Sequence, residues 1–104
     1  MTPAAQTPGD REVDRAFARF VERRDPDALA EVFDRTAHRL TLVAARLVCG
    51  DAHVAEDVVQ ATFLEAIRSA DRFRPGAAVV PWLLGILTHQ AARVRRRRTT
   101  NTER

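Results

Sequence analysis

The chain has 104 residues, of which 45% are hydrophobic, and this length leaves room for a single domain with a modest core. No window approaches the roughly 18 uninterrupted apolar residues of a transmembrane helix, and residues 1–10 lack the basic and apolar segments of a secretion signal, so we expect a cytoplasmic protein without a membrane partner. The 17 basic residues are all arginine and oppose 14 acidic residues, for a formal net charge of +3, yet five of the six residues from Arg93 to Arg98 are arginine. Positive charge is therefore concentrated near the C-terminus, which favours a nucleic-acid partner.

The chain divides into three predicted parts. Residues 1–9 hold two prolines and little to bury, which predicts a disordered lead. Residues 10–98 are expected to form the one helical domain, and residues 99–104 a flexible tail or the start of a linker. The first helix should begin at Asp10, and its apolar face at helical spacing comprises Val13, Phe17, Phe20 and Val21.

The second predicted helix begins at Asp25-Pro26, because aspartate is a favoured N-cap residue and proline fits the first helical turn. Gly50 should end it. Its apolar stripe predicts the core residues Leu29, Val32, Phe33, Leu40, Val43 and Leu47.

The third predicted helix has Asp51 as its cap and carries two apolar faces. One face comprises Val54, Val58 and Ala61, and the other comprises Val59, Phe63, Ala66, Ile67 and Ala70. A helix with two apolar faces contacts neighbours on both sides, so we expect it to lie centrally.

A loop at residues 71–80 follows, where Pro75 and Gly76 break the periodicity, and Pro81 then opens the last helix. The inward face of that helix should comprise Leu83, Ile86, Leu87, Gln90 and Val94. No alternation long enough for a strand is present. The sequence therefore predicts an all-α fold, a small bundle of about four helices whose neighbours are antiparallel.

Residues for metal, cofactor or enzymatic chemistry are sparse. The three histidines lie far apart, and Cys49 is the single cysteine, so we expect neither a metal site nor a cofactor. Neither a glycine-rich phosphate loop nor a nucleophile motif around Ser69 is present. We therefore expect that the protein is not an enzyme.

The segment Ala55 to Arg68, which reads AEDVVQATFLEAIR, resembles the central helix of the extracytoplasmic-function sigma factors of the bacterial sigma-70 family. The expected surroundings occur in order, with Gly50-Asp51 before this segment and Phe73 to Gly76, Pro81 to Ile86 and the arginine run after it. The resemblance covers roughly Leu29 to Arg98 and implies region 2 of a sigma factor.

In that family the central helix binds the clamp helices of core RNA polymerase. The resemblance therefore implies polymerase contacts on the exposed rim of the helix, at Asp57, Gln60, Ala61 and Leu64. The family commonly has glutamate where Ala61 stands, so this position offers no charge to the clamp. The alternative is that Asp57 merely complements the helix dipole and that Gln60 is a solvated surface residue.

The resemblance also implies that the loop at residues 71–80 captures an extruded base of the non-template strand of the promoter minus-ten element, beside the last helix. The implied DNA-binding residues are Arg74, Trp82, His89, Gln90, Arg93, Arg95, Arg96, Arg97 and Arg98. Phe73 is a further stacking candidate, although Phe73 and Trp82 could instead pack inside the bundle. The arginines would bind phosphates, or they form a solvated helix end that complements the dipole. The family usually has Asn at His89 and often Asp at Arg93, so the base preference does not carry over.

The leading hypothesis is a transcription initiation factor domain that binds core RNA polymerase and recognises and melts the minus-ten element. The first alternative is a truncated sigma-like interaction protein, which binds the polymerase clamp or an anti-sigma factor without productive promoter opening. A second alternative is a basic helical module that binds nucleic acid independently of polymerase. The family also leads us to expect a further helical domain after the arginine run, so this chain is either a fragment or naturally short.

Overall fold

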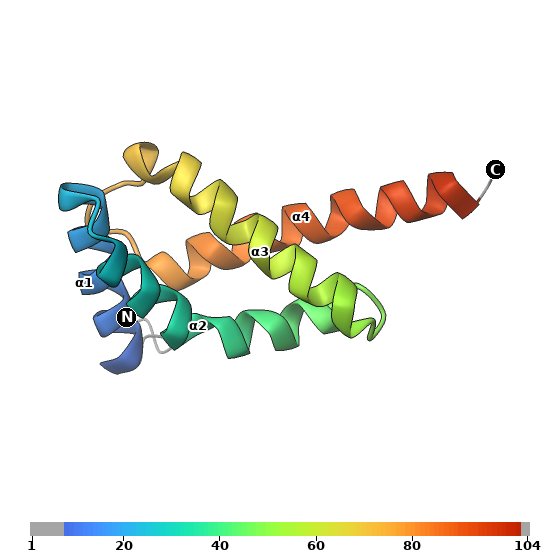
Figure 1. Cartoon of the computed structure of the whole chain (residues 1–104), viewed down its shortest axis with the longest axis horizontal. Helices are drawn as coiled ribbons and strands as arrows, with labels where there is room; N and C mark the ends of the chain where they lie inside the picture. Colours follow the sequence, from blue (N-terminus) through green and yellow to red (C-terminus); the bar gives the residue numbers. More distant parts are fainter. Residues whose placement is uncertain (1–7, 103–104) are drawn as a thin grey trace, which may run out of the picture.

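The computed structural model describes the backbone of residues 8–102 and the side chains of residues 10–98. Its elements are α1 (Pro8–Arg23), α2 (Pro26–Leu47), α3 (Ala52–Arg68), a 3-10 turn η1 (Ala70–Arg72) and α4 (Val79–Thr102). No strand occurs in this described part of the chain, and the predicted all-α bundle of about four helices is confirmed (Figure 1).

The helices α2, α3 and α4 run in alternating directions along the long axis of the molecule, while α1 crosses one end of this group of three (Figure 1). α3 packs against both α2 and α4, as its two apolar faces predict, but the expectation that it lies centrally was wrong, because α2 and α4 also pack against each other and against α1. The C-terminal part of α4 extends beyond the bundle. No helix in the described residues combines the length and apolar character that a membrane crossing requires.

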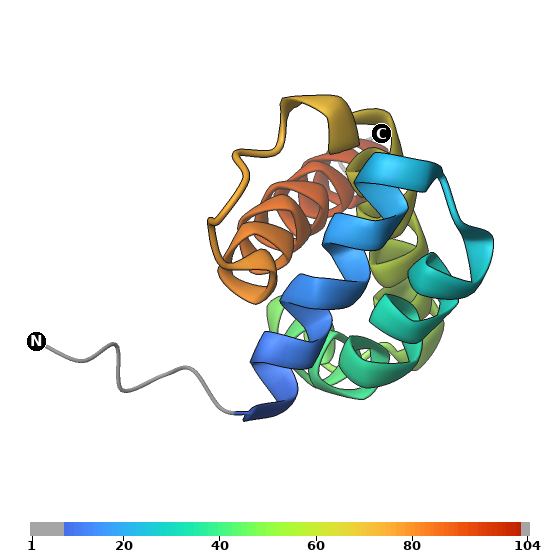
Figure 2. The same ribbon diagram turned by 90° about the vertical axis from the view of Figure 1, so that its left-hand side faces the viewer.

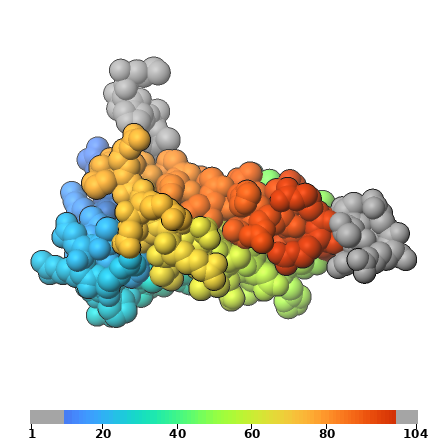
Figure 3. Space-filling view, turned by 90° about the horizontal axis from the view of Figure 1, so that it is seen from above, coloured from blue at the N-terminus to red at the C-terminus, as the bar shows by residue number. Residues whose placement is uncertain are grey.

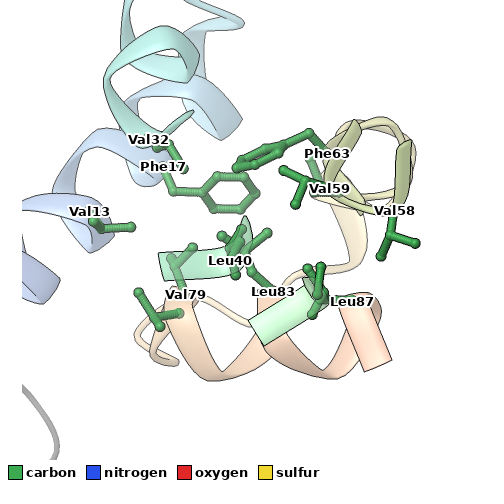
Figure 4. Packing of buried hydrophobic residues seen from close by; sticks show 14 of the residues in the cluster. Val13, Phe17, Val32, Leu40, Val58, Val59, Phe63, Val79, Leu83 and Leu87 are labelled. Atoms are coloured by element: carbon green, nitrogen blue, oxygen red, sulfur yellow. The ribbon is translucent and has the colours of Figure 1, made fainter. Parts of the chain in front are cut away.

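The hydrophobic core receives side chains from every α-helix (Figure 4). Phe17 of α1, Leu40 of α2, Val58 of α3, and Leu83 and Leu87 of α4 are each at most 1% exposed. Full burial of such a side chain contributes about 1.5–3 kcal/mol. The predicted inward faces of the first and last helices are therefore confirmed at Phe17, Leu83 and Leu87, whereas the predicted inward residues Ile86, Gln90 and Val94 are half-buried.

Phe33 departs from the predicted core. The stripe on α2 was expected to bury it, but the side chain is 41% exposed, and its ring packs against Phe63 with 4.9 Å between the ring centroids. The small residues Thr36 and Ala44 occupy buried positions on α2 instead, in register with Leu40. The Thr36 hydroxyl satisfies its own hydrogen bond by donating to the carbonyl of Val32 at 2.7 Å. The prediction for Phe33 was wrong because the buried face of α2 includes the small residues Thr36 and Ala44, which a search for large hydrophobic side chains does not find.

Local signals set the starts of α2 and α3. The Asp25 carboxylate accepts a hydrogen bond from the Asp27 amide at 2.9 Å, and the Asp51 carboxylate accepts one from Val54 at 3.2 Å. Both predicted caps are confirmed. At the end of α2, Cys49 adopts a φ of +61°, a left-handed position that favours glycine.

Four helix boundaries differ from the expected ones, and the first is that α2 ends at Leu47, three residues before Gly50. α1 begins at Pro8, inside the predicted lead, and α4 runs to Thr102, inside the predicted tail; residues 1–7 and 103–104 lie outside the described residues. α4 also begins two residues before Pro81, at Val79, whose amide donates to the Asp14 carboxylate of α1 at 2.9 Å. Pro81 then stands in the first turn, where its missing N–H is not needed.

Candidate functional site

The four residues predicted on the rim of the third helix lie on one face of α3. Asp57, Gln60 and Leu64 are exposed and Ala61 is half-buried, and their spacing of three and four residues aligns them along the helix. Leu64 is 55% exposed, which leaves a large apolar side chain open to a partner between polar neighbours. We call these four residues the α3 face.

The position of Asp57 weakens one of the alternatives for the α3 face. α3 begins at Ala52 and has no acidic residue in its first turn, so Asp57 lies beyond the turn in which the helix dipole acts most strongly. The opposite side of the helix is anchored in the core by Ala55, Val59 and Ala66, which are at most 4% exposed. The α3 face is thus held on a rigid element.

A second feature is a hollow of about 510 Å³ along α4, which we call the α4 groove. It is lined by Glu65, Pro81, Trp82, Gly85, Ile86, His89, Gln90 and Arg93. The structure therefore brings four of the predicted DNA-binding residues together, namely Trp82, His89, Gln90 and Arg93. Glu65 of α3 is a member that the sequence did not indicate, because only the packing of α3 against α4 places it there.

Aromatic packing fixes one end of the α4 groove. Phe73 and Trp82 contact each other with 4.7 Å between ring centroids, and both contact the buried ring of Phe17, at 5.1 Å and 5.3 Å. Both side chains are half-buried. Both rings thus combine packing in the bundle with a place in the wall of a hollow, Trp82 in the α4 groove and Phe73 in a second hollow beside α1.

Arg74 is exposed on the loop and does not line the α4 groove. Its carbonyl accepts a hydrogen bond from the Ala77 amide at 3.1 Å, which closes a turn around Pro75 and Gly76. Gly76 adopts a φ of +86°, a conformation that side chains disfavour. The loop therefore has a defined shape, with the guanidinium of Arg74 on its outside.

The arginine run divides between two sides of α4. Arg95 donates to the Leu47 carbonyl at 3.2 Å, and Arg98 lies 3.8 Å from the Asp51 carboxylate, so both reach the turn between α2 and α3. Arg93, Arg96 and Arg97 are also exposed, and their spacing of three and four residues places them on the opposite side of the helix. Figure 3 shows the α4 surface (orange to red) exposed beside that of α3 (yellow to green).

We call Arg95 and Arg98 the turn arginines, and Arg93, Arg96 and Arg97 the outer arginines. The outer arginines continue the line of His89 and Gln90 along α4. The turn arginines instead line a separate hollow of about 570 Å³ with Val48, Cys49, Gly50 and Asp51. The five arginines predicted to bind phosphate therefore fall into two groups with different surroundings.

Within the described residues, no group of three or more His, Cys, Asp or Glu side chains is arranged to hold a metal ion. Comparison with known proteins gives two matches in sequence. The family model described as Sigma-70 region 2 matches residues 32–100, from α2 into α4. The chain is also 45% identical over 65 residues to a protein of Myxococcus xanthus, RNA polymerase sigma factor CarQ, covering 62% of this chain and 37% of that relative.

The chain thus aligns with about 37% of the length of this curated relative. No solved structure matches it. The family match begins inside α2, so α1 lies outside it, while the α3 face and the α4 groove both lie within it.

Proposed function

The chain belongs to the sigma-70 family, as a region 2 domain of the extracytoplasmic-function type, and from this premise we propose that it is a transcription initiation factor domain. It binds core RNA polymerase, and it recognises and melts the promoter minus-ten element. It performs no catalysis itself, and it acts in the cytoplasm. The family match over residues 32–100 is the observation that carries this proposal.

The α3 face is the proposed contact with the clamp helices of core RNA polymerase. Leu64 offers an exposed apolar anchor, and Asp57 and Gln60 supply a polar rim around it. Interfaces commonly combine an apolar centre with polar surroundings in this way. Because the face belongs to a helix whose other side is buried, it requires little ordering on binding.

The α4 groove and the loop before it are the proposed contacts with the non-template strand. Trp82 gives an aromatic edge to the groove, while His89 and Gln90 carry donors and acceptors that can read base edges. Extrusion of a base costs a few kcal/mol of unstacking, which stacking and hydrogen bonds must offset. The outer arginines supply phosphate contacts that position the strand without reading its sequence.

Ala61 supports one second candidate function. It lies within the α3 face, where family members commonly carry a glutamate, and a face without that charge suits an interaction protein. Such a protein would bind the clamp or an anti-sigma factor without productive promoter opening. Both candidates bind through the α3 face, and they differ in how strongly that face holds the clamp and in whether the α4 groove reads DNA.

Binding to single-stranded non-template DNA separates the two candidates. We would titrate the protein, at physiological salt, into fluorescent oligonucleotides that carry varied minus-ten sequences, with a scrambled oligonucleotide of the same composition as control. A promoter-melting domain binds some of these sequences more tightly than the scrambled strand. Equal binding to all of them would contradict promoter recognition and favour the interaction protein.

A further inference from the structure

The helix α1 and the residue after it lie outside the matched residues 32–100, yet they contact the start of the segment that joins α3 to α4 and the first residue of α4. We call this segment, residues 69–78, the α3–α4 loop. Arg24, just after α1, lies 2.7 Å from the Asp71 carboxylate near the start of the loop. Asp14 accepts the hydrogen bond from Val79 at its end. In Figure 2 the loop (gold to orange) accordingly runs beside α1 down to the start of α4.

The bond from Asp14 has the chemistry of a helix cap. Val79 is the first residue of α4, and the first amides of a helix have no partner within it. A carboxylate is a favoured acceptor there, and its charge complements the positive end of the helix dipole. The preceding residue, Ala78, has no side-chain acceptor, so Asp14 performs the capping role from another helix, 65 positions away.

The two contacts at the ends of the loop differ in how much they stabilise it. The side chains of Arg24 and Asp71 are 46% and 77% exposed, and exposed ion pairs contribute little because water screens them. The Asp14 bond is part-buried and joins a charged acceptor to the backbone itself. Asp14 is therefore the contact that fixes where the loop ends.

Between α1 and the α3–α4 loop lies a hollow of about 410 Å³, within the size range of small-ligand sites. Its lining includes Ala18 and Val21 on the α1 side, and Phe73, Pro75 and Gly76 on the loop side. Asp14 also lines it. The shape of the hollow thus depends on how the loop is held against α1.

We propose that Asp14 is a positioning residue for base capture, because its carboxylate holds the α3–α4 loop so that the hollow against α1 admits an extruded base. This inference rests on the proposed function. It adds that α1, outside the family match, completes the base-binding site. Phe73 offers the stacking surface on the loop side of the hollow.

The test uses single-stranded non-template DNA. The tightest-binding oligonucleotide from a panel of minus-ten sequences is remade with an abasic site at each position in turn. For the wild-type protein we expect one position at which base removal weakens binding about fivefold or more, since a stacked base is lost. For Asp14→Ala we expect this penalty to fall below about twofold, and Asp14→Asn should restore it because its amide oxygen still accepts the Val79 hydrogen bond.

Asp10→Ala is the matched control. Asp10 is a buried carboxylate of α1 that binds Arg39 of α2 at 3.0 Å, so its loss weakens the docking of α1 while the hydrogen bond from Val79 to Asp14 stays in place. This variant should keep the wild-type abasic penalty. Ala18→Trp is a second probe, at an exposed position, which should abolish the penalty by filling the hollow while Asp14 stays in place.

The possible outcomes are distinguishable. A wild-type penalty that persists in Asp14→Ala or in Ala18→Trp overturns the inference and leaves the proposed function standing. Equal loss of the penalty in Asp10→Ala and Asp14→Ala also overturns it, since general docking of α1 would then be the cause. If the wild-type protein shows no position sensitive to base removal, base capture itself fails, and the proposed melting function fails with it.

Discussion

Two pairs of arginines on α4 allow a matched test of the phosphate contacts. Arg93→Gln with Arg97→Gln removes two outer arginines, and Arg95→Gln with Arg98→Gln removes both turn arginines. Each double variant lowers the formal net charge by two from its wild-type value of +3, and each keeps polar side chains on the helix. Any difference between the pairs therefore reports position and not total charge.

The expected magnitudes follow from the contacts. Each phosphate contact with a single strand contributes about 0.7 to the slope of log affinity against log salt concentration, so loss of two outer arginines should reduce the slope by about 1.4. The turn arginines are engaged with the Leu47 carbonyl and with Asp51, so their loss should reduce it by less than about 0.7. Their loss should instead destabilise the fold by about 1 kcal/mol, or about 4–8 °C in Tm for a domain of this size.

Fluorescence anisotropy with one labelled single-stranded oligonucleotide at a series of salt concentrations gives the slopes, and thermal unfolding gives Tm. We expect the outer pair to reduce the slope and leave Tm unchanged, and the turn pair to lower Tm with a smaller reduction of the slope. Equal reductions of the slope in both double variants would refute the division of the arginine run into two functional sides.

Two further predictions concern stability. Leu40→Ala should lower the free energy of unfolding by about 2–5 kcal/mol, because the Leu40 side chain is 0% exposed. Phe33→Ala should lower it much less, because the Phe33 side chain is 41% exposed. Equal losses of unfolding free energy in urea denaturation would contradict this placement of the core. Cys49→Gly should stabilise the protein by about 0.5–1 kcal/mol, because glycine adopts the φ of +61° at the end of α2 without steric cost, and a lower Tm for this variant would contradict the strain at that position.

Features that depend on neighbouring residues were predictable from the sequence. The caps at Asp25 and Asp51 follow from local hydrogen bonding, and each is seen in the structure. The α3 face was also predictable as a geometric unit, because positions on one helix keep their relative directions whatever the helix packs against. The helical spacing of apolar residues likewise sufficed to predict the burial of Phe17, which is 1% exposed.

Features that depend on contacts between distant segments were not predictable. No local rule links Asp14 to the start of α4, because the acceptor and the amide are 65 positions apart. In the sequence the arginine run is a single basic block. Only the structure shows that Arg95 and Arg98 contact the turn between α2 and α3, unlike the three outer arginines. The place of Glu65 in the α4 groove requires the packing of α3 against α4 in the same way.

The central claim is that the α3 face binds core RNA polymerase, and direct binding of the chain to purified core enzyme tests it. Asp57→Arg reverses a charge in the middle of the proposed contact, while Glu22→Arg makes the same change on α1, outside the matched residues, at another exposed position. We expect wild type and Glu22→Arg to bind alike and Asp57→Arg to bind at least about tenfold more weakly, as for a like-charge or unpaired contact at an interface. Failure of the wild-type chain to bind, or unchanged binding by Asp57→Arg, would contradict the account.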